Sequence, residues 1–358
     1  MAPNKPKNDS QILRQCEVIV RNALPPTWRL TTTYEPLRAS GLLDALFNLT
    51  SPSGEQVTYV VKARRQSTTK NILIAAEQAN RYLGNGHEEG HALIATQYIS
   101  PRSREVLKDL GVNYVDTTGN VRLRSDSPGL FIEIQGANKD PWPDDTPLRS
   151  LGGRGAGRAM RALIDLRPPY GVRELSAKTN VPAATLSRVI DLLEREALLE
   201  RDKNGGVSNV NWMGAIRRWS EDYELRKANT VDTYLEPRGI ESLLPRLSEA
   251  KSRYAITSSL AAKWFEPIAP TRTAIIYVDN SAEFASELGI RSADSGFNIA
   301  LAEPYDKVVF ERTMIFNEFI VASPSQIAVD LMTGFGREPS EGEELLLWME
   351  RHQDAWRS

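Results

Sequence analysis

The chain has a single cysteine, Cys16, so no disulfide can form within it, and we expect a small buried hydrophobe there and not a reactive thiol. No apolar run approaches the roughly 18–20 residues of a membrane span. The N-terminal stretch MAPNKPKNDS lacks the apolar core of a signal peptide. These absences exclude disulfide-stapled and membrane-spanning classes, and they predict a cytoplasmic protein without membrane contacts.

Histidine is scarce, with three in 358 residues. His87 and His91 are four apart, a spacing that brings two imidazoles to one helix face for zinc. The surrounding GNGHEEGH is too rich in glycine for a helix, no third ligand is evident, and we interpret it as a solvated loop. His352 stands alone in the last predicted helix. We therefore predict neither a metal site nor a cofactor.

Excess positive charge is also missing, because 44 basic and 46 acidic residues leave a net charge of −2. This balance argues against a chain coated with positive charge for bulk nucleic-acid binding. It does not exclude a local basic face, since phosphate contact requires a patch and not a basic total.

A length of 358 residues suggests two or three domains. Strand and helix patterns alternate before and after a central helical segment, and NKDPWPDDTPLRSLGGR is the clearest linker. The predicted fold is a multidomain α/β and α+β chain. Its predicted parts are an α/β domain at 1–140, a linker at 141–154, a winged helix-turn-helix at 155–226 and a second α/β domain at 227–358.

The central segment has the pattern of three helices followed by a hairpin. AMRALIDLR ends before Pro168-Pro169, VRELSAKTN follows, and a short turn at Asn180-Val181-Pro182 leads into AATLSRVIDLLEREALL. We expect Val172, Leu175 and Ala177 to face inward from the second helix. In the third, Leu186, Ile190 and Leu193 share the inward face, with Val189 beside them. This order predicts a winged helix-turn-helix.

The exposed side of the third helix suits reading of the DNA major groove. Small residues in its first turns let the backbone approach the bases, and Arg188 reaches a guanine edge or a phosphate. The predicted hairpin turns at Lys203-Asn204-Gly205-Gly206 and forms the wing. The predicted DNA-binding residues are Arg154, Arg158, Arg173, Lys178, Ala183, Ala184, Thr185, Ser187, Arg188, Lys203 and Asn204.

Further basic residues are candidates for contacts with the phosphate backbone. SLGGRGAGR has neither the lysine–serine end of a phosphate-binding loop nor a preceding strand, so we interpret it as a basic linker, with Arg161 close behind. Lys62, Arg64 and Arg65 lie at a basic strand end. Because a lone winged helix covers little DNA, useful affinity requires either such added contacts or a homodimer that reads two half-sites.

The N-terminal region has the outline of a restriction-endonuclease core, in which two acids and a lysine hold a metal that activates water. Asp44 fits the first acid and Lys62 the lysine. Val60 occupies the position of the second acid, and neither Glu17 nor Glu35 has diagnostic spacing for a further one. We therefore predict a non-catalytic scaffold and keep a metal-dependent nuclease as the alternative.

The C-terminal region contains TSSLAAKWF, Thr257 to Phe265, which is similar to the opening of nucleotidyltransferase-type folds. Those enzymes need a pair of acids shortly afterwards to hold magnesium. Lys263, Trp264 and Phe265 follow here, and no such pair is nearby. We predict a non-catalytic relative of that fold.

Three stretches together resemble one family. They are YISPRSREVLKDLGVNYVDTTGNVRLR, the segment 155–212, and YAITSSLAAKWFEPIAPTRTAIIYVD with EPYDKVVF and VASPSQIAVDLMTGFGR. The chain resembles the AbiEi-like transcriptional regulators, the antitoxins of type IV toxin–antitoxin systems. The resemblance implies an antitoxin that represses its own operon and opposes a nucleotidyltransferase-like toxin without binding it tightly. The best-described members carry the winged helix at the N-terminus, whereas here it is central.

We therefore expect a sequence-specific, double-stranded DNA-binding repressor and not an enzyme. Two alternatives stay open. One is the metal-dependent nuclease, and the other is a winged helix that binds only protein.

Overall fold

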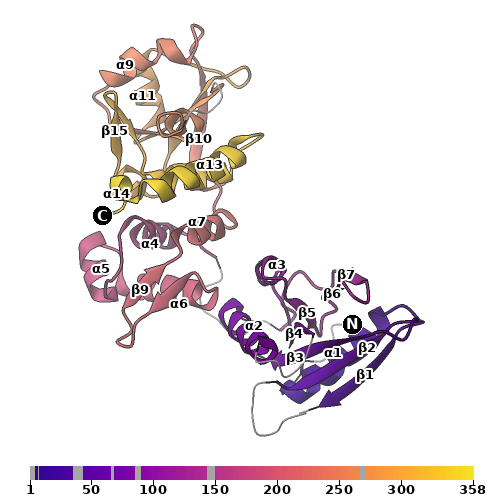
Figure 1. The fold of residues 1–358 in the computed structure, drawn as a ribbon. Coiled ribbons are helices and arrows are strands. Elements are labelled where there is room, and N and C mark those ends of the chain that lie inside the picture. The colour runs from indigo at the N-terminus through magenta and orange to yellow at the C-terminus, as the bar shows by residue number, and fades with distance from the viewer. Residues whose placement is uncertain are drawn as a thin grey trace. The chain divides into compact units, whose positions relative to one another are not determined.

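The computed structural model describes residues 5–6, 8–34, 43–65, 68–84, 90–142, 150–266 and 271–358. The chain forms two compact units, one of Met1–Thr146 with Arg195–Ala197 and one of Pro147–Glu194 with Leu198–Ser358 (Figure 1). Both combine helices with a mixed sheet, which confirms the α/β class predicted from the sequence. Residues 143–149, within the predicted linker, lie outside the described residues.

The first unit contains a seven-stranded sheet whose strands lie side by side in chain order. They are β1 (Arg29–Tyr34), β2 (Ala45–Thr50), β3 (Gln56–Arg64), β4 (His91–Thr96), β5 (Asn113–Asp116), β6 (Val121–Ser125) and β7 (Leu130–Ile134). The pairs β3–β4 and β4–β5 are parallel, and the others are antiparallel. The parallel pairs are joined through helices, as crossover connections require.

Helices cover both faces of this sheet because β3 carries apolar side chains on both of its sides. Tyr59 and Val61 pack in the core with α1 (Asp9–Ala23), which also buries Cys16. Val60 packs in the core with α2 (Thr69–Gly84). The third helix of this unit, α3 (Pro101–Asp109), begins after a cap, where Ser100 accepts from the Ser103 amide at 3.1 Å.

Most of what we call the helix–hairpin segment, residues 154–220, belongs to the second unit, and only Arg195–Ala197 group with the first. Its elements are α4 (Arg154–Asp165), α5 (Val172–Thr179), α6 (Ala183–Arg195), β8 (Leu199–Arg201), β9 (Val207–Val210) and α7 (Trp212–Ser220). The three helices and the hairpin occur where the sequence predicts them. Tyr170 adds a bridge to Val207, so a third piece of extended chain lies beside the hairpin.

The rest of the second unit is built on a seven-stranded mixed sheet with the order β13-β10-β14-β12-β11-β16-β15. The strands are β10 (Thr230–Leu235), β11 (Tyr254–Thr257), β12 (Ala274–Val278), β13 (Arg291–Ser292), β14 (Ile299–Glu303), β15 (Met314–Phe316) and β16 (Phe319–Val321). The helices are α8 (Leu225–Ala228), α9 (Leu244–Ser248), α10 (Ser258–Ala262), α11 (Ser281–Leu288), α12 (Pro324–Met332), α13 (Glu338–Arg351) and α14 (Gln353–Trp356). Two short 3-10 turns, Ile240–Ser242 and Lys307–Phe310, complete it.

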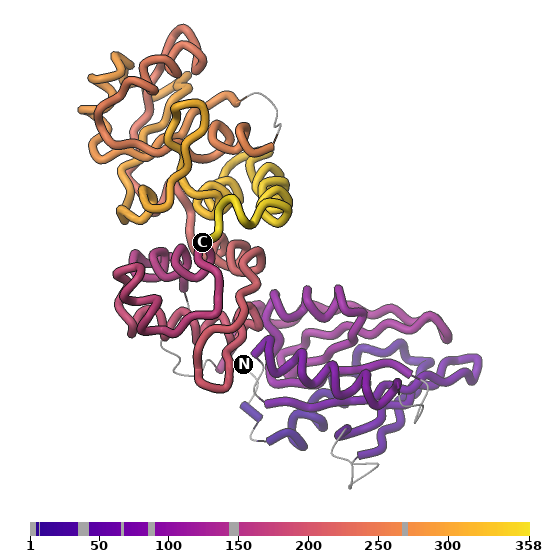
Figure 2. The backbone as a smooth tube through the Cα atoms, turned by 60° about the vertical axis from the view of Figure 1, so that its left-hand side comes forward, coloured from indigo at the N-terminus to yellow at the C-terminus, as the bar shows by residue number. Residues whose placement is uncertain are grey.

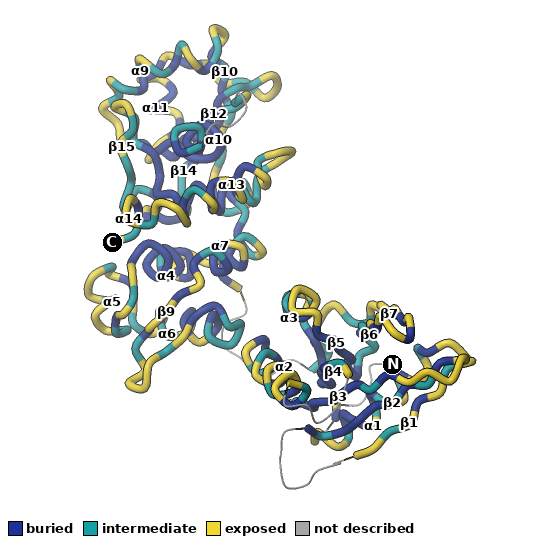
Figure 3. The backbone as a smooth tube through the Cα atoms, viewed as in Figure 1, coloured by how far each residue is buried: buried dark blue, intermediate teal, exposed yellow. Residues whose placement is uncertain are grey.

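One hydrophobic core runs through both parts of the second unit, from Leu151 to Trp356. Helix α4 is buried along most of its length (Figure 3). Helix α12 is buried from Pro324 to Leu331 and packs against α4 and α7 as well as against the sheet. The helix–hairpin segment therefore shares its core with the seven-stranded sheet of the second unit.

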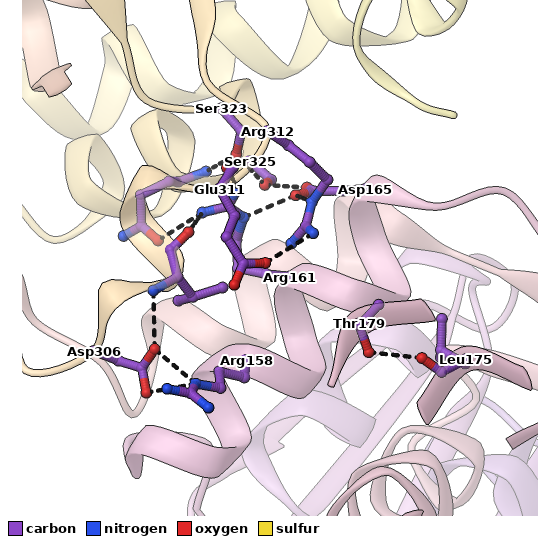
Figure 4. A network of polar contacts seen from close by, with 12 residues as sticks. Arg158, Arg161, Asp165, Leu175, Thr179, Asp306, Glu311, Arg312, Ser323 and Ser325 are labelled. Carbon is purple, nitrogen blue, oxygen red and sulfur yellow. Dashed lines mark hydrogen bonds and ion pairs between the residues drawn. The ribbon is translucent and has the colours of Figure 1, made fainter. Parts of the chain in front are cut away.

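Contacts around a buried ion pair on α4 join this helix to the sheet part of the second unit. Arg161 and Asp165 are both fully buried and are joined at 2.9 Å (Figure 4). Arg312 reaches the same carboxylate at 2.8 Å, and the Ser325 hydroxyl donates to it. Burial by itself opposes ionisation of Asp165, but the two guanidinium groups outweigh it and hold the pKa of this carboxyl below its ordinary value. Arg161 also donates to the Glu311 carbonyl at 2.7 Å.

The last residues of the chain lie against the end of α4, as Figures 1 and 2 both show. Arg357 donates to the carbonyls of Ile164 at 2.9 Å and Leu166 at 3.3 Å. The Ser358 amide donates to the backbone carbonyl of Asp165 at 3.1 Å. Carbonyls at the end of α4 are thereby satisfied by a segment far away in sequence.

We expect Asp165→Ala to lower the free energy of unfolding of the second unit by about 3–5 kcal/mol, because it leaves two guanidinium groups without their carboxylate in the core. The matched control is Asp354→Ala. Its carboxylate is 94% exposed and pairs with Arg167 at 2.5 Å, so we expect a change within about 0.5 kcal/mol. Urea unfolding followed by tryptophan fluorescence measures both. Similar values for the two variants would contradict the anchoring role.

A second buried carboxylate, Asp330 on α12, also joins the two parts of the unit. It accepts hydrogen bonds from Thr257 at 2.5 Å, Gln326 at 2.9 Å, Tyr277 at 2.9 Å and Tyr223 at 3.0 Å. Tyr223 follows α7, whereas Tyr277 lies on β12. Burial raises the pKa of Asp330 to about 6, although these donors favour the charged form.

This pKa implies a pH dependence of stability. Because the pKa in the folded chain lies above the ordinary value of 3.8, the folded state binds this proton more tightly than the unfolded chain. The contribution is complete below about pH 4 and is lost as the pH rises through about 6. Between about pH 4.5 and pH 6.5, the free energy of unfolding of the wild type should decline more steeply than that of Asp330→Asn, which cannot titrate. Parallel pH profiles in urea unfolding would contradict this expectation.

Candidate nucleic-acid interface

Helix α6 has one face in the core and one face in solvent. The residues predicted to face inward are all buried, namely Leu186, Val189, Ile190 and Leu193. On the other side Ala184 and Arg188 are exposed, while Ala183, Thr185 and Ser187 are half-buried. The small side chains of the first turns therefore leave the α6 backbone accessible from solvent.

The turn between α5 and α6 holds the two helices rigidly. Asn180 adopts the left-handed conformation, with φ of 54°. Val181 is buried and its carbonyl accepts from the Ser176 hydroxyl at 2.7 Å. The Pro182 carbonyl accepts from the Thr185 amide at 2.8 Å, which closes the first turn of α6. A turn of three residues with these bonds is typical of a helix-turn-helix.

Five cations of the helix–hairpin segment are exposed and have no carboxylate partner within the described residues: Arg154, Arg173, Lys178, Arg188 and Lys203. All five were predicted from the sequence as DNA-binding residues. Arg188 donates from Nε to the Ala184 carbonyl at 3.1 Å, which directs its side chain toward the first turn of α6. Ala177, which we expected to face inward from α5, is exposed instead.

The tip of the β8–β9 hairpin is coloured as exposed in Figure 3. Lys203 and Asn204, which lie in this turn, are both exposed. Asp202 Oδ1 accepts from the amides of Asn204 at 2.7 Å and Gly206 at 2.9 Å, so one oxygen of its carboxylate is bound by the turn itself. Gly205 has φ of +81°, a conformation that glycine adopts without steric cost. The acid at the tip thus accepts from backbone donors through one of its oxygens, and the lysine beside it is exposed.

The start of α4 lies beside the first turn of α6. A Cβ added to Gly155 would come within 3.2 Å of the Thr185 side chain, so glycine permits this close approach. Arg154 precedes Gly155 and is exposed. The sequence assigned Arg154 to a linker, whereas the structure makes it the first residue of α4, next to the small residues of α6.

Two neighbouring arginines are used inside the unit (Figure 4). Arg161, which we predicted as a phosphate contact, is fully buried, so that prediction is wrong. Arg158 pairs with Asp306 at 2.8 Å, and this hydrogen bond raises the pKa of its guanidinium. Arg158 stays a candidate only through the 40% of its side chain that is exposed.

In the first unit the predicted nuclease-like residues do meet. Asp44 precedes β2 and accepts from Lys62 Nζ at 3.3 Å and from the Ala63 amide at 2.8 Å. Lys62 is buried, so it is used by this pair and is not presented for phosphate contact. Val60, on the same strand, is fully buried in the apolar core under α2. Arg64 donates to the Gln78 side chain at 2.6 Å and also lies 3.8 Å from the Asp44 carboxylate.

The other acids and histidines considered for metal binding are not brought to this place. Glu17 on α1 accepts from Arg21 at 2.8 Å and from the Tyr34 hydroxyl. His91 begins β4, with its ring beside Tyr59. Glu35 and His87 lie outside the described residues. Within those residues no three His, Cys, Asp or Glu side chains are arranged to hold a metal ion.

The hydroxyls of the serine-rich turn in the C-terminal sheet are bound by acids of α12 and α13. Thr257 donates to Asp330, the Ser258 hydroxyl donates to Glu338 at 2.5 Å, and the Ser259 hydroxyl donates to Glu341. Each hydroxyl therefore has a carboxylate partner from the chain itself. These serines join the β11–α10 turn to α13.

Arg201, on β8 of the hairpin, was not among the residues predicted from the sequence for this interface. Its guanidinium lies against the carboxylates of Asp191 and, at 3.0 Å, Glu194, both on α6. Arg201 is separated from Asp191 and Glu194 by more than the three or four residues that separate a pair within one helix. Helical spacing therefore could not predict these ion pairs.

No protein-family model matches this chain, and no curated protein matches its sequence. None of the helices in the described ranges has both the length and the apolar character that crossing a membrane requires.

Proposed function

We propose that the chain is a sequence-specific, double-stranded DNA-binding regulator of transcription, and that residues 155–226 form a winged helix-turn-helix. The observation that carries this proposal is the set of five exposed cations without carboxylate partners on α4, α5, α6 and the hairpin tip. Two nearby acids have partners within the segment, since Asp202 Oδ1 accepts from the turn and Asp191 pairs with Arg201. We infer that these cations give a chain with a net charge of −2 a local basic face.

In the proposed complex α6 enters the major groove. Ala183, Ala184, Thr185 and Ser187 let its backbone approach the base edges, and Arg188 makes the specifying contact. The remaining cations contact phosphates, which orient the protein without reading sequence. These are Arg154 at the start of α4, Arg173 and Lys178 on α5, and Lys203 with Asn204 on the wing.

The regulatory role that we propose is that of an autorepressing antitoxin-type protein in the cytoplasm, functionally linked to a nucleotidyltransferase-like toxin. It is supported by the resemblance of three stretches of the chain to AbiEi-like regulators. The flanking α/β parts then position the winged helix and perform no chemistry. Tight operator binding requires either their added contacts or a homodimer, because one winged helix covers little DNA.

Two substitutions test the interface. Arg188→Ala should weaken specific binding by about 1–3 kcal/mol, because it removes a contact with a base edge. Lys203→Ala should weaken binding to all sequences alike and flatten the salt dependence, because it removes a phosphate contact. Gel-shift titration of the full chain on a duplex from its own promoter measures both.

The matched control is Arg291→Ala, which removes an exposed arginine of β13 and should leave affinity unchanged. Unchanged affinity in the Arg188→Ala/Lys203→Ala double variant would contradict the assignment of these residues to a DNA interface. Retained folding with no DNA binding by the wild type would favour the alternative in which the winged helix binds only protein.

A nuclease is the second candidate function, because the Asp44–Lys62 pair has the outline of a restriction-endonuclease core. The buried Val60 argues against it, since the second metal-binding carboxylate is replaced by an apolar side chain. We expect the purified chain to leave supercoiled plasmid intact in Mg²⁺ or Mn²⁺. Cleavage that disappears in Asp44→Ala and Lys62→Ala proteins would establish the nuclease instead.

A further inference from the structure

The base of the hairpin is tied to α6 by one arginine. Arg201, at the end of β8, contacts Asp191 and Glu194, which lie one turn apart on α6. Asp191 is 59% exposed and occurs three residues after Arg188, on the exposed side of the helix. The face that carries the proposed base-reading arginine thus also carries a carboxylate.

An irregularity in the hairpin accompanies this contact. Glu200 pairs with Asn209 and Arg201 pairs with Val207, so Ser208 is an extra residue on β9. A bulge of this kind twists a strand and re-aims a side chain. The Ser208 hydroxyl donates to the Glu200 carbonyl at 3.2 Å within the same irregularity. The bulge occurs at the position from which the Arg201 side chain reaches α6.

Asp191 and Glu194 have a consequence for any polyanion that approaches α6. Screening by salt acts over about 10 Å at 0.1 M ionic strength, so carboxylates on the same helix face repel phosphates at contact range. Arg201 is 25% exposed and lies on both carboxylates, where its charge offsets theirs. The same contacts fix the hairpin, and hence Lys203 at its tip, against α6.

We propose that Arg201 is a positioning residue of the DNA interface. It offsets the charge of Asp191 and Glu194 and holds the wing against the recognition helix, without contacting DNA itself. This inference rests on the proposed function, because it assigns a role within the same surface.

The test is a double-mutant cycle in the full chain, measured by gel shift on one duplex over a range of salt. Arg201→Ala should lower affinity by about 3- to 30-fold. The Arg201→Ala/Asp191→Asn double variant removes one cation and one anion and so restores the local charge. We expect it to recover most of the lost affinity and to keep the wild-type salt slope, because no phosphate contact has been removed.

Two further variants complete the experiment. Arg201→Lys keeps the charge, so we expect it to bind within about 3-fold of the wild type. Arg291→Ala is the matched control for loss of an exposed arginine elsewhere. Thermal melting of each variant confirms that it is folded at the temperature of the titration.

The outcomes separate this inference from the proposed function. A salt slope reduced by about one in Arg201→Ala, without recovery in the double variant, would make Arg201 a direct phosphate contact and overturn the positioning role. Arg201→Ala that binds like the wild type would also overturn it, while leaving the proposed function intact. A wild-type chain that binds no duplex would overturn the proposed function and this inference together.

Discussion

The ion pair between Arg161 and Asp165 is the constraint on which the second unit depends. A guanidinium and a carboxylate without contact to water must satisfy one another, and Arg312 and Ser325 complete the set from the sheet side. A displaced α4 would separate Asp165 from Arg312 and Ser325. Helix α4 also shares its core with α5, α6 and α12.

The chemistry of the proposed interface follows from which charges this arrangement consumes. Arg154, Arg158 and Arg161 all lie on α4. Arg158 and Arg161 form ion pairs with carboxylates, whereas Arg154 is exposed to solvent. The distance to a carboxylate, and not the residue type, decides which arginine is available to a phosphate. The same reasoning separates Arg201, which lies on acids of α6, from Arg188.

In the first unit, one acid and one lysine of the predicted nuclease outline meet, while an apolar residue stands at the position of the second acid. The antiparallel pairing of β2 and β3 sets Asp44 opposite the end of β3, so its carboxylate meets Lys62. Val60 lies two residues earlier, which is the same side of the strand, and there it fills the core under α2. A carboxylate at that position would be buried among apolar side chains at a large desolvation cost unless a metal compensated for it. An apolar core residue, Val60, thus occupies the position at which the nuclease outline would have a metal-binding carboxylate.

Local physics made much of this chain predictable from sequence. Apolar spacing predicted α6 and its inward residues, and a glycine pair predicted the hairpin turn at Gly205. Each of these signals depends on residues a few positions apart. The exposed candidates Arg188 and Lys203 were predictable for the same reason, since they lie opposite the apolar face or at a turn.

Tertiary structure alone decided the fate of the remaining charges. Arg161 was predicted as a phosphate contact and is buried, because the carbonyls of Val308 and Glu311 to which it donates come from about 150 residues away in the chain. Ala177 was expected to face inward, but the short α5 buries Leu175 and leaves Ala177 in solvent. The sequence by itself determined where helices and turns form, because those depend on neighbours along the chain. Which polar groups remain free to bind depends on long-range packing, which brings distant carboxylates to some arginines and leaves others in water.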